Sequence, residues 1–237
     1  MTWSGRREGG SRFLIWLYGR IGVHLGRPFA RVFLWPIAIY FFARRRAERV
    51  ASRAFLSRAF GRRATFLEVM RHIYIYSATI LDRVFLLSGP IERFDVRVHG
   101  LDELNRLLRP DRGLLLLGAH IGSFEVLRSL GRERPDVEVR VVMDRKQTPV
   151  LTELLHELNP DVRTHIIDAG GDPAELALKM AEAAGRGMLI GLLGDRTRPG
   201  QATEPAEFFG ETARFPTAPY LLASVLQIPI VLCFGLY

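Results

Sequence analysis

Cysteine and lysine are nearly absent from this chain of 237 residues. The one cysteine, Cys233, excludes an internal disulfide framework and fits a reducing compartment. Lys146 and Lys179 are the only lysines among 33 basic residues, so arginine supplies almost all of the positive charge. Residues 1–100 hold 18 basic and 6 acidic side chains, whereas residues 101–237 hold 15 and 19. The net charge of +8 therefore comes from the N-terminal part, which is not the distribution of a uniformly basic nucleic-acid-binding protein.

A hydrophobic run long enough to cross a lipid bilayer is also missing. The longest unbroken apolar stretch, residues 32–43, has 12 residues, whereas a spanning helix needs about 20. The three arginines that follow it do not fit the cleavage site of a signal peptide. We therefore expect residues 1–12 to form a disordered tail and residues 13–63 to form a helical, membrane-associated segment that lies at the bilayer surface.

The aromatic side chains of this segment are expected at headgroup depth, with its arginines on lipid phosphates. Two alternatives remain open: a helical hairpin that packs on the core of the domain, and a tilted span with snorkelling arginines. The aromatic residues concerned are Trp16, Tyr18, Phe29, Phe33, Trp35, Tyr40, Phe41 and Phe42.

Residues 64–237 are predicted to form one α/β domain with a largely parallel central sheet flanked by helices. Apolar segments of strand length alternate with segments of helical periodicity, which is typical of this architecture. Because the chain stops at Tyr237 directly after an apolar segment, we expect the domain to be truncated at its C-terminus. The predicted strands are residues 93–98, 113–118, 137–142, 163–167, 187–193 and 229–234. The predicted helices are residues 47–63, 64–87, 101–108, 123–131, 148–158, 173–184 and 216–226, with a long polar loop before the last one.

One histidine stands where a predicted strand gives way to a predicted helix. His120 follows an apolar run, and Gly122 and Ser123 open the next helix. Glu125 lies in the first turn of that helix, close enough in sequence to bend back toward the imidazole. A carboxylate that fixes the tautomer of a histidine makes the ring a general base. The alternative is a hydrogen-bonded loop histidine beside an ordinary first-turn carboxylate.

Two more polar clusters follow predicted strands. Asp144, Arg145 and Lys146 form one cluster, and the sequence Asp-Arg-Thr-Arg at residues 195–198 forms the other. In open α/β sheets, ligands bind outside the carboxyl ends of the strands, so we expect these loops and that of His120 to converge on one crevice. Each cluster taken alone also fits a salt bridge or a turn at a strand end.

Metal and serine-nucleophile chemistry are not expected. The other five histidines are scattered, and none has ligand spacing with His120. The sequence has no Gly-x-Ser-x-Gly elbow, and Ser123 lies only three residues from His120. No metal and no cofactor is therefore predicted.

The three polar clusters carry a resemblance to a known family. The segment 120–125 resembles the His-x4-Asp/Glu box of the glycerolipid acyltransferase superfamily, and its glutamate is similar to the late (lauroyl or myristoyl) acyltransferases of lipid A biosynthesis. A strand followed by Arg145 and a helix resembles the second box of that branch. Residues 195–200, then 208–210 (Phe-Phe-Gly) and 214–219 (Arg-Phe-Pro-Thr-Ala-Pro), resemble its third region. The chain departs from that region at Thr197, where the family usually has a second acidic residue, which bears on the acceptor.

The resemblance implies an O-acyltransferase at the cytoplasmic face of the bacterial inner membrane. A fatty acyl chain would pass from an acyl-carrier-protein or acyl-CoA thioester to a hydroxyl of a lipid acceptor similar to a lipid A precursor. The expected partners are the membrane surface, the lipid acceptor and an acidic acyl carrier protein, without nucleic acid. The implied catalytic residues are His120 as base, Glu125, Arg145 and Asp195. The implied substrate-binding residues are Arg196, Arg198, Lys146, Gly122, Ser123, Phe209 and Gly210.

Other functions remain open from the sequence. The acceptor can be a glycerophospholipid or another amphipathic lipid, and a hydrolase can use the same histidine and glutamate. A basic membrane-bound scaffold without activity, or a nucleic-acid-binding protein, would explain the charge but not the three boxes.

Overall fold

The computed structural model describes residues 26–88, 94–123, 136–144, 166–197 and 200–236. Its contacts divide the chain into two compact units. The α/β unit comprises Leu86–Pro205 and Arg214–Tyr237, and the helical unit comprises Gly9–Phe85 and Ala206–Ala213. Each unit is described by itself below.

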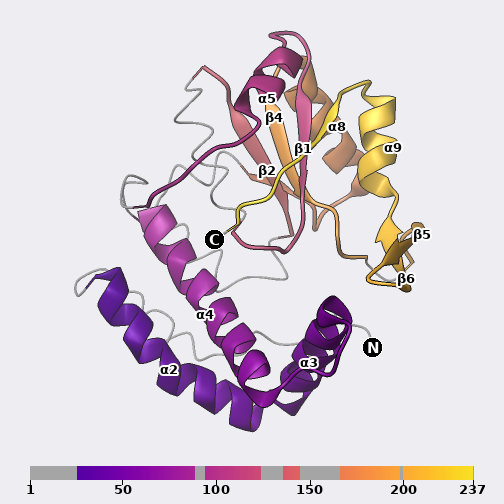
Figure 1. The fold of residues 1–237 in the computed structure, drawn as a ribbon. Helices are drawn as coiled ribbons and strands as arrows, with labels where there is room; N and C mark the ends of the chain where they lie inside the picture. The colour runs from indigo at the N-terminus through magenta and orange to yellow at the C-terminus, as the bar shows by residue number, and fades with distance from the viewer. Residues whose placement is uncertain (1–25, 89–93, 124–135, 145–165, 198–199, 237) are drawn as a thin grey trace. The chain divides into compact units, whose positions relative to one another are not determined.

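A parallel sheet of five strands forms the centre of the α/β unit (Figure 1). The strands lie in the order β3-β2-β4-β1-β7, and every neighbouring pair is parallel. Their bounds are β1 Leu114–Gly118, β2 Val139–Met143, β3 Ile166–Asp168, β4 Leu189–Leu193 and β7 Ile230–Leu232. This sheet confirms the predicted α/β class and its largely parallel arrangement.

Helices cover both faces of this sheet. Successive side chains of β1 point to opposite faces, so Leu115 packs in one cluster and Leu114 and Leu116 in another. The first cluster includes Met180 of α8 (Pro173–Gly185) and Ala223 of α9 (Ala218–Val225), and the second includes Leu104 of α5 (Leu101–Leu107). All five β1 residues are buried, which explains why this strand appears in the sequence as a continuous apolar run.

Two predictions within the α/β unit are wrong. Residues 94–98 alternate apolar and polar side chains, but they pair with no strand in the described structure and stay largely exposed. The predicted polar loop contains an antiparallel hairpin, β5 (Thr203–Phe208) and β6 (Glu211–Pro216). Apolar periodicity did not predict strand β5, because the residues of β5 are mostly exposed and include a proline. The helices predicted at 123–131 and 148–158 lie outside the described residues.

Three helices make up most of the helical unit: α2 (Arg27–Arg44), α3 (Arg46–Phe60) and α4 (Phe66–Ser88). Helix α3 ends at Gly61, whose φ of 62° is the left-handed conformation that glycine adopts easily. A capping box starts α4, because the Thr65 N–H donates to Glu68 (2.8 Å) and the Glu68 N–H donates to Thr65 (3.3 Å). Among the described residues, no helix combines the length and apolar character that a membrane span requires.

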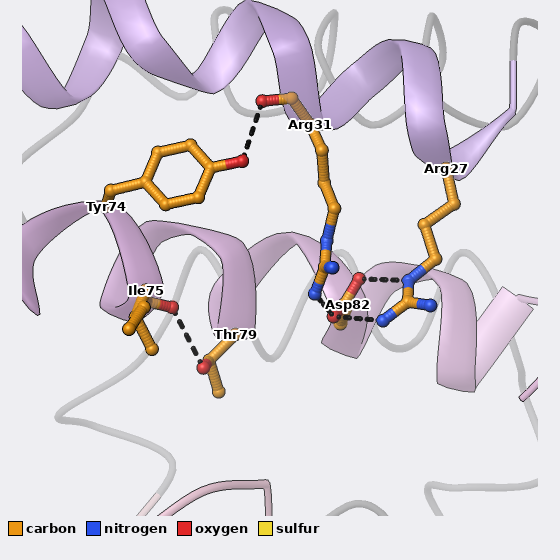
Figure 2. A network of polar contacts seen from close by, with 6 residues as sticks. All are labelled: Arg27, Arg31, Tyr74, Ile75, Thr79 and Asp82. Carbon is orange, nitrogen blue, oxygen red and sulfur yellow. Dashed lines mark hydrogen bonds and ion pairs between the residues drawn. The ribbon is translucent and has the colours of Figure 1, made fainter. Parts of the chain in front are cut away.

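A buried carboxylate joins α2 to α4 (Figure 2). Asp82 is fully buried and accepts two hydrogen bonds of 2.8 Å from Arg27 and one of 2.7 Å from Arg31. These two arginines therefore pair with a protein carboxylate, which differs from their predicted place on lipid phosphates. Phe42 is likewise buried, in contact with Phe66, instead of lying at headgroup depth.

Four other aromatic residues of α2 are exposed, and their place at headgroup depth stays a prediction. Phe29, Phe33, Trp35 and Tyr40 are between 44% and 58% exposed. The opposite stripe of the helix is buried, and it consists of Ala30, Leu34, Ala38 and Phe42. Helix α2 thus combines a buried stripe with exposed apolar side chains.

The Asp82 cluster predicts a large loss of stability on Asp82→Ala. Removal of the carboxylate leaves two arginines held close together without a counter-charge, so we expect the free energy of unfolding to fall by about 3 kcal/mol. Urea denaturation followed by circular dichroism measures this change. The matched control is Asp95→Ala, whose partner Arg97 is exposed and whose loss should cost less than about 1 kcal/mol. Equal effects of the two substitutions would contradict this account of α2 and α4.

Candidate active site

The register of the sheet places two polar side chains next to each other. Strands β1 and β4 pair in parallel with Leu114 opposite Leu189 and Gly118 opposite Leu193. The Gly194 N–H then donates to the Gly118 carbonyl at 2.9 Å, so the two chains stay side by side beyond the strands. Two residues past the last pair, the same register brings His120 opposite Asp195.

The contact between His120 and Asp195 uses both carboxylate oxygens. The ring Nδ1 lies 2.8 Å from Asp195 Oδ1, and the backbone N–H of His120 donates to Oδ2 at 3.1 Å. The His120 and Asp195 side chains are 34% and 26% exposed, so the pair is partly buried and remains accessible to a ligand. Carboxylate and imidazole are therefore held at two points, which fixes the orientation of the ring.

Asp195 is an ionised acceptor in this pair. Burial raises the pKa of Asp195, but the hydrogen bond from the His120 ring, the charge of that ring and the backbone N–H together outweigh it and hold the pKa below its usual range. A carboxylate can only accept, so Nδ1 carries the proton and donates it. The other ring nitrogen, Nε2, then has the lone pair with which a neutral histidine takes up a proton.

The loop that carries His120 is fixed at its other end by a close backbone approach. The Ser123 N–H donates to the Gly235 carbonyl at 2.8 Å, and Gly122 forms a parallel bridge with Gly235 just beyond β7. A Cβ on Gly122 would lie 1.8 Å from that carbonyl oxygen, and the φ of Gly122 is +68°. Only glycine fits both conditions. Gly122 and Ser123 therefore anchor the loop through their backbone, and their predicted role in substrate binding stays a prediction.

The ends of three predicted loops lie at the same edge of the sheet. Strands β2, β4 and β1 are consecutive in the sheet, so Asp144, Asp195 and His120 all follow carboxyl ends that are neighbours. Asp144 lies near Asp168, because a Cβ on Gly170 would be 2.8 Å from one carboxylate and 3.2 Å from the other. Arg196 follows Asp195 and is exposed. Within the described part of the chain, no group of three or more metal-ligating side chains is close enough to hold a metal ion.

The remaining predicted site residues fall elsewhere or outside the described structure. Phe209 and Gly210 form the turn between β5 and β6, with φ values of 53° and 74°, and belong to the helical unit. The Phe209 ring lies 5.9 Å from that of Phe55 and 4.4 Å from that of Phe208, measured between centroids. The residues outside the described ranges are Glu125, Arg145, Lys146 and Arg198, and their roles stay predictions.

The partner of His120 was not found from the sequence. Proximity in the chain indicated Glu125 as the orienting carboxylate, whereas the structure places Asp195 against the ring. A usable signal was present in the strands themselves. In each strand the polar residue of interest lies two positions after the last paired residue, His120 after Gly118 and Asp195 after Leu193. Adjacent strands with equivalent ends bring together residues that are distant in sequence.

Comparison with protein-family models matches residues 7–237 to the bacterial lipid A biosynthesis acyltransferases. A search of curated proteins found no match.

The close approach at Gly122 predicts a severe effect of Gly122→Ala. We expect the free energy of unfolding to fall by more than about 3 kcal/mol, because positive φ and a backbone collision act together. Gly200→Ala is the matched control, since Gly200 also has a positive φ of +79° but nothing within 4 Å of its Cβ position. Strain alone costs about 1–2 kcal/mol. Similar denaturation midpoints for both variants would refute the anchoring role of the Gly235 carbonyl.

The lowered pKa of Asp195 predicts how its contribution to stability depends on pH. The folded state favours the ionised carboxylate, so the contribution is present above the unfolded value of about 3.9 and is lost as pH falls through the folded pKa. Asp195→Asn should therefore be less stable than the parent chain at neutral pH, and the difference should shrink on acidification below about pH 4. Denaturation midpoints measured from pH 7 to pH 3 test this. A difference that stays constant over that range would show that the pair contributes no ionic stabilisation.

Proposed function

The chain belongs to the bacterial lipid A biosynthesis acyltransferase family, and from this membership we propose that it transfers a fatty acyl chain from a thioester to a hydroxyl of a lipid acceptor similar to a lipid A precursor. The donor is acyl carrier protein or coenzyme A. The observation that carries the proposal is the His120 and Asp195 pair, in which a carboxylate fixes the ring so that Nε2 is the basic nitrogen. A general base of this form is what attack by a lipid hydroxyl on a thioester requires.

The reaction proceeds by direct attack on the thioester. His120 Nε2 takes the proton from the acceptor hydroxyl as the hydroxyl oxygen bonds to the thioester carbonyl carbon. Asp195 stabilises the imidazolium that forms, because its ionised carboxylate accepts the Nδ1–H. When the tetrahedral intermediate collapses, the carbon–sulfur bond breaks and the imidazolium returns the proton to the departing thiolate. No acyl-enzyme is formed, since a thioester is activated enough for attack by an oxygen nucleophile.

Other predicted residues support this chemistry. A tetrahedral oxyanion needs donors, and the Ser123 N–H already donates to Gly235, so the oxyanion role goes to Arg145. Arg196, Arg198 and Lys146 bind phosphates of the acceptor or of the pantetheine arm. The role we propose for Glu125 is the one expected from the sequence, which is to orient and charge the imidazole. Phe209 and Gly210 serve the acceptor lipid at the tip of the hairpin.

The setting we propose is the cytoplasmic face of the bacterial inner membrane. The 18 basic against 6 acidic side chains of residues 1–100 suit an anionic lipid surface and an acidic acyl carrier protein. The exposed aromatic residues of α2 suit the depth of the headgroups. Both substrates of the reaction carry acyl chains, so an enzyme held at the membrane meets its acceptor there.

Acyl transfer by site variants tests the proposal. In membranes supplied with acyl carrier protein thioester and a lipid A precursor, His120→Ala should lower the rate at least about a hundredfold, because the base is lost. Asp195→Asn should cause a loss of about the same order, because an amide can hold the wrong tautomer. Asp102→Asn, an exposed carboxylate on α5, is the control and should transfer at the parent rate. Near-parent rates for both site variants would overturn the mechanism.

Identification of the product separates acyl transfer from its rivals. Mass spectrometry of lipids from cells with and without the gene should show one acylated species that depends on the gene. An acylated glycerophospholipid in place of a lipid A species would identify a glycerophospholipid as the acceptor. Free fatty acid as the product would assign a hydrolase, and an unchanged lipid profile would refute the proposed function.

A further inference from the structure

An open hollow with an apolar lining lies on the helical unit. It has a volume of about 430 Å³ and is formed by Trp35 of α2 and by Leu67, Met70, Arg71, Tyr74 and Ile75 of α4. We call it the α2/α4 groove. All but one of its side chains present apolar or aromatic surface, so water solvates it poorly.

Two of the lining residues are aromatic rings in contact with each other. Trp35 and Tyr74 stack with their centroids 4.4 Å apart and an angle of 20° between their planes. The Tyr74 hydroxyl donates to the Arg31 carbonyl at 3.1 Å, as Figure 2 shows, so its polar end is satisfied between the helices. Trp35 stays 46% exposed, so this ring pair contributes flat carbon surface to the lining that a hydrocarbon chain can contact.

The lining also includes exposed aliphatic side chains. Leu67 is 75% exposed and Ile75 is 44% exposed. Val32 and Ile39, at 65% and 53% exposed, lie one helical turn before and after Trp35 on α2. Apolar surface thus continues beyond the groove over an area that one small ligand does not cover. A bilayer covers such a surface and also supplies a chain to fill the groove.

Arg71 supplies the charge at this site. It lines the groove and is exposed, and the described residues include no hydrogen-bond or ion-pair partner for it. Arg27 and Arg31 on the neighbouring helix, in contrast, are paired with Asp82. An arginine beside a hydrocarbon-lined groove matches the phosphate at the head of an acyl chain.

We propose that the α2/α4 groove binds one acyl chain of an anionic phospholipid of the bilayer, with the lipid phosphate on Arg71. The groove is built wholly from the helical unit, so this is a lipid site additional to the His120 site. It rests on the proposed function in one respect, which is that the chain works at a membrane. The bound lipid is a membrane component and undergoes no reaction there.

Tryptophan fluorescence reads the groove directly. In the full chain with Trp3→Phe and Trp16→Phe, Trp35 is the remaining one of three tryptophans. Vesicles of phosphatidylcholine and phosphatidylglycerol with brominated acyl chains should quench its emission, because bromine quenches at contact. Leu67→Glu should weaken vesicle binding about tenfold and reduce the quenching, because a charge replaces apolar contact. Leu178→Glu, at a leucine of α8 that is 70% exposed, is the matched control and should change neither.

The charge of Arg71 has its own variant. Arg71→Gln should weaken binding to vesicles that contain phosphatidylglycerol about fivefold and leave binding to pure phosphatidylcholine unchanged. Arg106→Gln, at an exposed arginine of α5, should have no effect on either. Equal losses on both kinds of vesicle would overturn the phosphate contact.

Other results decide against the groove. Quenching by brominated fatty acid without vesicles, as strong as that by bilayers, would assign a soluble ligand. Self-association that Leu67→Glu abolishes in sedimentation velocity would assign the surface to a second copy of the chain. If Trp35 is not quenched while the chain still transfers acyl groups, the groove is wrong and the proposed function stands. If Trp35 is quenched and no acyl group is transferred, the groove stands and the proposed function is wrong.

Discussion

The hydrogen-bonded ladder between β1 and β4 is the constraint on which the candidate active site depends. Its register fixes which residue of one loop meets which residue of the other, and it continues through the Gly194 to Gly118 hydrogen bond into the loops themselves. His120 and Asp195 are then held by two further bonds. The leucines of β1 hold the strand in place by packing into apolar clusters on both faces of the sheet. The apolar core therefore sets the geometry of the polar site.

The fold was largely predictable because buried strands and helices have apolar residues at regular spacing in the sequence. The predicted strands that became β1 and β4 are continuous apolar runs, and α8 agrees with its prediction at the first residue. The hairpin of β5 and β6 was missed because its side chains are mostly exposed and show no such spacing. Residues 94–98 show the converse error, since alternation predicts a strand even where no neighbour is present to pair with it.

The sequence predicted which residues form the candidate site, but it did not predict that His120 and Asp195 contact each other. His120 and Asp195 were both singled out because each follows an apolar strand. Their contact depends on which strands are neighbours in the sheet, and a single sequence does not state the strand order. In the helical unit the same limit applies to Asp82. Helical periodicity indicated an apolar α4 but gave no sign that its one buried carboxylate would bind two arginines of α2.

The bridge between Gly122 and Gly235 has a consequence for the order in which the molecule assembles. Gly235 is far from Gly122 in the chain, so the loop of His120 reaches its final shape only after β7 has joined β1. Contacts of such long sequence separation form late in folding, because the entropy of closing the intervening chain opposes them. During synthesis on the ribosome, the histidine is thus made early but held in its working position late. A nascent chain that has not yet released β7 carries the base without the scaffold that orients it.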